Sequence, residues 1–159
     1  MQVIDRQLLA RVVQQAKEAP RLRKNYNLHP ADGAKCHRLL NAIEPGSYIR
    51  PHRHLDPEKD EAFVILQGKL AVISFDGEGN ILATAIIAAG GEAVAADIPH
   101  GMFHTAVSLA SGTVFFEAKA GPYLPFAETE KAQWAPDEGT PAAAAYLSSL
   151  EQRVAGQNG

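Results

Sequence analysis

Apolar residues near the start of the chain repeat at helical spacing. Positions three and four residues apart share one face of an α-helix, and here they form an apolar stripe. Asp5 can cap the start of such a helix, and Pro20 would end it. The sequence therefore predicts an amphipathic helix over residues 5–19. Its apolar face comprises Leu8, Leu9, Val12, Val13 and Ala16.

From Lys35 the pattern changes to short apolar runs, separated by residues that favour turns. Eight such runs without intervening helices favour an all-β fold, either an antiparallel barrel or a double-sheet jelly roll. The predicted strands span residues 35–43, 47–54, 61–67, 69–75, 80–88, 93–98, 103–109 and 113–119.

The remainder of the chain is expected to pack around this barrel. Residues 1–34 supply the first helix and a connector, and residues 35–136 form the barrel. Within residues 137–159, an alanine-rich run over 142–154 predicts a second helix, and the tail from Gly156 is expected to be disordered. We expect all three parts to form a single structural domain.

Composition and charge limit the functional classes. A length of 159 residues suits one domain with one core, and a net charge of -3 provides no basic field for nucleic acid. The single cysteine, Cys36, excludes an internal disulfide and is typical of a reducing compartment. The first residues lack the apolar core of a signal peptide, and no run approaches a membrane span. We therefore expect a cytoplasmic protein that binds neither nucleic acid nor membrane.

Three histidines and a glutamate have spacings suited to a metal site. His52 and His54 alternate along a predicted strand, so both can point to one face. Glu61 begins the next apolar run, and its face also carries apolar residues, where a carboxylate needs a compensating cation. His104 follows a predicted turn. Imidazoles with one carboxylate suit one divalent ion such as Zn, Fe, Mn, Ni or Co.

Further residues are candidates for binding a ligand of that ion. In a regular strand, Tyr48 and Arg50 would share the inward face with the two histidines, although Pro51 can break this register. Arg50 can bind a small polar or anionic molecule, or it can pair with a nearby acid at the rim. Glu117 can face the pocket, but we expect no further lysine or carboxylate to serve as a base.

The same residues resemble the two motifs of cupin proteins. Gly46, His52, His54, Glu61 and Gly68 resemble the first motif in their order and spacing. The run from Pro99 through Gly101 to His104 resembles the second motif, although this chain has Ser108 where the motif has asparagine. The resemblance implies a cupin-type double-stranded β-helix, a jelly-roll barrel, that holds a metal through His52, His54, Glu61 and His104.

A more specific resemblance covers residues 4–136. The segment from Arg21 to His29, Gly121 to Tyr123, and the pair Gln133 and Trp134 are similar to the WbuC family of cupin-fold metalloproteins. The family's name reflects occurrence beside surface-polysaccharide genes, so the resemblance implies a link to surface-polysaccharide synthesis. Cupin-type barrels commonly pair, so the resemblance also implies a homodimer.

Two alternatives remain open at the site. The carboxylate of the first motif normally lies closer to the second histidine, where this chain has Glu58; Glu61 alone keeps the motif's distance to Gly68. The segment from Arg21 to His29 can fold across the barrel mouth and recognise an anion, or it can form a loop packed on the sheet.

Three functions fit a cupin-type metal site. A metalloenzyme, such as an isomerase or oxygenase, would act on a small polar or sugar-derived metabolite through open metal positions. A binding or sensing protein would use the same cavity without turnover. A purely structural metal site would have a closed coordination shell. The fold cannot choose between them, because one architecture hosts many chemistries.

Overall fold

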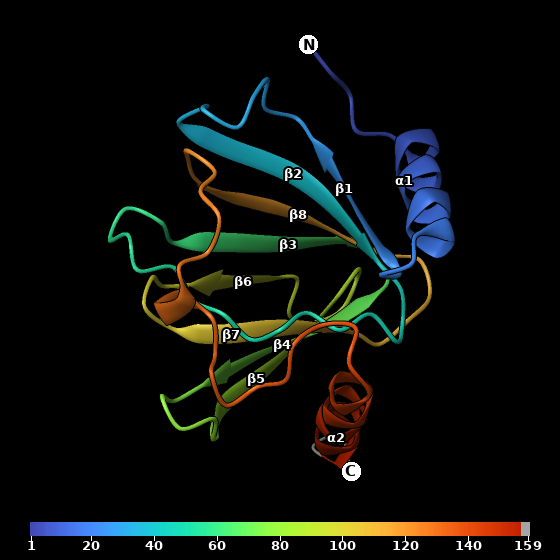
Figure 1. The fold of residues 1–159 in the computed structure, drawn as a ribbon. Helices are drawn as coiled ribbons and strands as arrows, with labels where there is room; N and C mark the ends of the chain where they lie inside the picture. The colour runs from blue at the N-terminus through green and yellow to red at the C-terminus, as the bar shows by residue number, and fades with distance from the viewer. Residues whose placement is uncertain (157–159) are drawn as a thin grey trace.

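The computed structural model describes residues 1–156 and has a helix at each end of a β-rich chain (Figure 1). The last three positions of the tail that is expected to be disordered, 157–159, lie outside the described residues. In chain order the elements are α1 (Arg6–Glu18), β1 (Arg23–Asn27), β2 (Cys36–Ile43), β3 (Glu61–Gln67), β4 (Lys69–Phe75), β5 (Ile81–Ala88), β6 (Ala95–Ile98), β7 (Phe103–Ser108), β8 (Thr113–Ala120), the 3-10 helix η1 (Glu128–Glu130) and α2 (Pro141–Gly156).

The strands form two antiparallel sheets. One sheet has five strands in the order β1-β2-β8-β3-β6, and the other has three in the order β5-β4-β7. Every pair of neighbouring strands is antiparallel. Strands adjacent in a sheet are mostly distant in sequence, as in a jelly roll. The all-β jelly roll of two antiparallel sheets expected from the sequence is confirmed.

Alternation along the strands decides which side chains enter the space between the sheets. In β4, Leu70 and Val72 point inward, where they meet Phe63 and Phe115 of the larger sheet. Ile73 lies on the opposite face of β4 and packs towards α2. The core between the sheets therefore consists of apolar residues from both, and it forms the base of the cavity described below.

A helix covers the outer face of each sheet (Figure 1). The N-cap Asp5 accepts a 2.8 Å hydrogen bond from the backbone nitrogen of Leu8, as the sequence predicts. The apolar stripe of α1 packs on Leu40 and Val114 of the five-stranded sheet. Helix α2 buries Leu147 and Leu150 against the three-stranded sheet. Within residues 1–156, no helix is both long and apolar enough to cross a membrane.

Seven of the eight predicted strands form, but the prediction of a strand over residues 47–54 is wrong. This segment is extended and makes only isolated bridges, from His52 to His104 and to Lys131. Pro51 has no backbone N–H to donate to a ladder, although its carbonyl accepts from Ala132 at 3.0 Å. Residues 47–54 therefore lie between β7 and the chain next to η1.

One strand is absent from the prediction. β1 (Arg23–Asn27) lies within the expected polar connector and pairs with β2 at the edge of the larger sheet. Its sequence is polar and its side chains are mostly exposed, so it lacks the apolar alternation that marks a buried strand. Charged residues are common in edge strands because they hinder pairing with another chain.

Candidate metal centre

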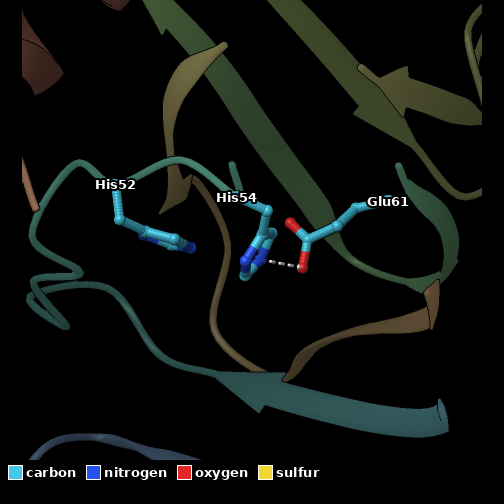
Figure 2. Close-up of side chains that lie close together, drawn as sticks. All are labelled: His52, His54 and Glu61. Atoms are coloured by element: carbon cyan, nitrogen blue, oxygen red, sulfur yellow. Dashed lines mark hydrogen bonds and ion pairs between the residues drawn. The ribbon is translucent and has the colours of Figure 1, made fainter. Parts of the chain in front are cut away.

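Three separate segments bring the predicted metal ligands together. His52 and His54 come from the extended segment before β3, Glu61 is the first residue of β3, and His104 lies on β7. Potential ligand atoms of His52, His54 and Glu61 all lie within 4.8 Å of one another (Figure 2). Nε2 of His104 lies 2.9 Å from Oε2 of Glu61, so the fourth residue adjoins the same cluster.

Backbone carbonyls determine the tautomers of two histidines. Nδ1 of His52 lies 3.1 Å from the carbonyl oxygen of Arg50, and Nδ1 of His104 lies 3.0 Å from that of Met102. A carbonyl oxygen can only accept, so both Nδ1 atoms must carry the hydrogen. In the neutral rings, both Nε2 atoms then present lone pairs, as metal-ligating imidazoles held by a second hydrogen bond do.

The contact between His104 and Glu61 tests whether a metal fits. With its Nδ1 protonated, a neutral His104 would direct an Nε2 lone pair at a carboxylate oxygen 2.9 Å away. Two acceptors at this distance require a proton or a cation between them. A divalent ion would accept both lone pairs, so the donor set fits a metal.

Glu61 is 2% exposed, yet it is held in its charged form. Burial by itself raises the pKa of Glu61. In the metal-free site, hydrogen bonds from His104 and His54, together with the charge of Lys119, hold this pKa well below its usual value. His104 can donate this bond only when both of its ring nitrogens carry a hydrogen, so the proton takes the place of the cation between His104 and Glu61. The alternative carboxylate, Glu58, is exposed in the loop before β3. The structure therefore brings Glu61, and not Glu58, to the histidines.

Comparison with known proteins places the chain in a family. The sequence profile described as "Domain of unknown function (DUF6016)" matches residues 4–87, just over half of the chain. The chain belongs to the DUF6016 family. Among the curated proteins, none matches it by sequence.

Solved structures resemble this DUF6016 protein in fold. TT1209 from Thermus thermophilus is 21% identical, with a TM-score of 0.53 over 76% of this chain and 97% of that one. The conserved protein SPY1581 of unknown function from Streptococcus pyogenes is 13% identical, with a TM-score of 0.50 over 77% and 90%. A cupin-2 domain protein from Shewanella frigidimarina is 16% identical, with a TM-score of 0.47 over 62% and 80%. At these identities the likeness concerns the fold alone.

A cavity of about 470 Å³ opens beside the predicted ligands. Its volume is within the range of small-molecule sites. Its walls combine the apolar Phe63 and Phe115 with the polar ends of Asn41, Glu117 and Lys119. The structure therefore pairs the candidate metal centre with space for a small ligand.

The structure separates the two residues predicted to line the mouth. Arg50 lines the cavity, but its guanidinium donates to the carbonyl of Ala132 and pairs with Asp137. Tyr48 instead packs in the core beneath α2, where its hydroxyl donates to the carbonyl of Pro136 at 2.9 Å. The alternation argument fails for this pair, because residues 47–54 are not a regular strand.

The segment from Arg21 to His29 contributes part of the rim. Arg21, Arg23 and Asn25 line the cavity, and Arg23 donates to both carboxylate oxygens of Glu138 at 2.7 Å. His29 is buried and stacks on His37 with 3.9 Å between ring centroids. The first half of the segment thus borders the cavity, and its end packs into the protein.

Lys119 is the principal cavity residue that the sequence pattern did not reveal. Its ammonium lies 2.5 Å from Oε1 of Glu61 and 2.6 Å from Oε1 of Glu117. Burial by itself lowers the pKa of Lys119, but the two carboxylates, Glu117 first, outweigh burial and raise it. Alternation with Phe115 and Glu117 along β8 was the available signal, because these three residues share one strand face.

Proposed function

We propose that this protein is a metalloprotein that binds a small anionic metabolite, and that it acts on this molecule as an enzyme. The observation that carries the proposal is the convergence of His52, His54 and Glu61, whose ligand atoms lie within 4.8 Å of one another beside a cavity. His104 would be the fourth ligand. When bound, a divalent ion would supply Lewis-acid activation of an oxygen ligand or of water.

The surroundings of the site support a ligand-binding role over a purely structural one. Zn, Fe, Mn, Ni and Co are the candidate ions, and those that accept five or six ligands would keep positions open beyond four protein side chains. The ring of Phe126 and the side chain of Phe63 make part of the wall apolar, whereas Lys119 and Arg23 add positive charge. A small molecule with a negative end and a less polar body suits this cavity.

The finer features of the proposal rest on the resemblance to the WbuC family. That resemblance supports a sugar-derived substrate connected with surface-polysaccharide synthesis, and isomerisation or oxygen chemistry as the reaction. A non-catalytic sensor would use the same cavity, and the tight carboxylate contacts of Lys119 favour this second candidate, because a held lysine is not a ready base.

The test begins with protein purified without chelator. Elemental analysis should find about one equivalent of a first-row transition metal per chain. Incubation with small hydroxy acids and sugar nucleotides, followed by mass spectrometry, then separates turnover from binding. Metal-free protein that cannot be loaded would refute the metal site, whereas loaded protein that binds without converting any compound would favour the sensor.

A further inference from the structure

Lys119 occupies an unusual position between two buried carboxylates. It projects from β8 between Glu61, a proposed metal ligand on the neighbouring strand β3, and Glu117, two residues earlier on β8. Glu61 and Lys119 are directly opposite each other in the register of the two strands. The lysine therefore links the metal centre to the floor of the cavity.

The second carboxylate is held firmly. Glu117 is 7% exposed, and its Oε2 accepts a 2.6 Å hydrogen bond from the side-chain amide of Asn41 on β2. Oε1 of Glu117 lies 2.6 Å from Nζ of Lys119. Glu117, which is itself held by Asn41, therefore holds the ammonium from one side, and Glu61 holds it from the other.

The ammonium retains capacity to bind a ligand. A lysine has three N–H donors, and among residues 1–156 the carboxylates of Glu61 and Glu117 account for two of them. The side chain of Lys119 is 19% exposed and lines the cavity. A third donor can therefore reach a molecule inside the cavity.

Charge balance indicates which molecule this is. A divalent ion and Lys119 together exceed the charges of Glu61 and Glu117 by one, with the three histidines neutral. Phe63 and Phe115 make the surroundings apolar, and an uncompensated charge there is costly. A monoanion that touches both the ion and the ammonium would neutralise the site.

We infer that Lys119 is the binding residue for the carboxylate of a small monoanionic acid that also occupies an open position on the metal. The inference rests on the proposed metal site and names the chemical class of its ligand. Glu117 acts as a positioning residue because it holds the ammonium, and Asn41 holds Glu117. The competing explanation is that Lys119 only compensates two buried carboxylates.

The experiment uses protein loaded with Co²⁺, whose visible spectrum reports on ligands of the metal. Glycolate is the anionic probe, glycolamide is its neutral counterpart, and imidazole is a metal ligand that needs no cation. Lys119→Met combined with Glu117→Gln removes the ammonium without leaving Glu117 charged and unpaired. Lys131→Met is the matched control, because Lys131 lines the same cavity and pairs with Glu128 at 2.7 Å.

Wild type and Lys131→Met should bind glycolate more tightly than glycolamide. The double variant should bind glycolate about tenfold more weakly or worse, on the scale of one hydrogen bond to a charged group. Its imidazole affinity and cobalt content should match those of the wild type. If the double variant loses cobalt, Lys119→Gln replaces it in the same titration, with the same expected loss.

Unchanged glycolate affinity in the variant would overturn the inference, as would wild-type protein that holds cobalt but ignores glycolate. Either result would leave the proposed metal site intact. Wild-type protein that cannot hold cobalt would overturn the proposed function and this inference together.

Discussion

The ring of Phe126 stacks on the imidazole of His54, with 5.4 Å between the centroids and 27° between the planes. Phe126 also lies 4.5 Å from the ring of His52 and lines the cavity. It is 38% exposed, so the ring contacts two predicted ligands and remains partly accessible to solvent. A chelator approaching the metal from this side would meet Phe126 first.

We therefore expect Phe126→Ala to speed the removal of metal by a chelator several-fold, with little change in the amount bound at equilibrium. Stopped-flow mixing with a coloured chelator measures the rate. Tyr123→Ala is the control, because Tyr123 lies in the same segment and is 58% exposed. Equal rates for Phe126→Ala and wild type would show that the ring does not guard the site.

Loss of the histidines should empty the site. His52→Ala combined with His104→Ala removes two of the four predicted ligands, and metal content should fall from about one equivalent to a small fraction. His100→Ala is the control, since His100 is exposed and pairs with Asp60. Elemental analysis measures the metal content of the purified variants. A double variant that still carries a full equivalent of metal would contradict the assignment of His52 and His104 as ligands.

The two candidate carboxylates give a separate prediction. Glu61→Gln should weaken metal binding by at least about tenfold, as outer-shell changes alone already cost 10- to 100-fold at metal sites. Glu58→Gln should leave it unchanged, because Glu58 is exposed in a loop. Competition with a chelator of known affinity measures both; the reverse order would transfer the ligand role to Glu58.

The metal-free protein should lose stability in acid. Burial, followed by the charge of His104, lowers the pKa of His52 to about 3. An unfolded histidine titrates near 6.5, so between about pH 6.5 and pH 3 the unfolded state binds the extra proton. The free energy of unfolding should therefore fall as pH decreases through this window, by at most about 1.4 kcal/mol per pH unit for this group.

Urea unfolding of chelator-treated protein at pH 7 and pH 4 measures this loss. His52→Gln cannot be protonated, so its loss between the two pH values should be smaller than that of wild type. An equal loss in both proteins would show that His52 does not contribute.

A homodimer remains a prediction. Val64 and Leu66 on the outer face of β3 are each 37% exposed, and Val94, whose carbonyl accepts from the backbone of Ile65, is 48% exposed. Neighbouring exposed apolar residues of this kind are common at subunit interfaces. Light scattering should give a mass of two 17.1 kDa chains. Val64→Glu combined with Leu66→Glu should shift the measured mass towards that of one chain. Wild type at the mass of one chain would contradict the prediction.

Local patterns in the sequence determined the elements whose signals lie within a few residues. The apolar stripe and Asp5 predicted α1, because helical periodicity and capping are properties of neighbouring residues. The alternation of Glu61 and Phe63 predicted an inward-facing carboxylate on β3 for the same reason. The close spacing of His52 and His54 likewise indicated a metal site, because ligand type is a property of the residues themselves, although the strand predicted to carry them does not form.

Only the tertiary structure decided what lies opposite those residues. The register between β3 and β8 places Lys119 against Glu61, and the pairing of strands far apart in sequence depends on packing of the whole core. His52 is held by isolated bridges to His104 and Lys131, and the predicted strand ladder does not form. Alternation assigns a side chain to one face of its strand, but it does not identify the distant strand that lies beside it. That pairing depends on long-range contacts, and here it places Lys119 of β8 in the cavity beside Glu61.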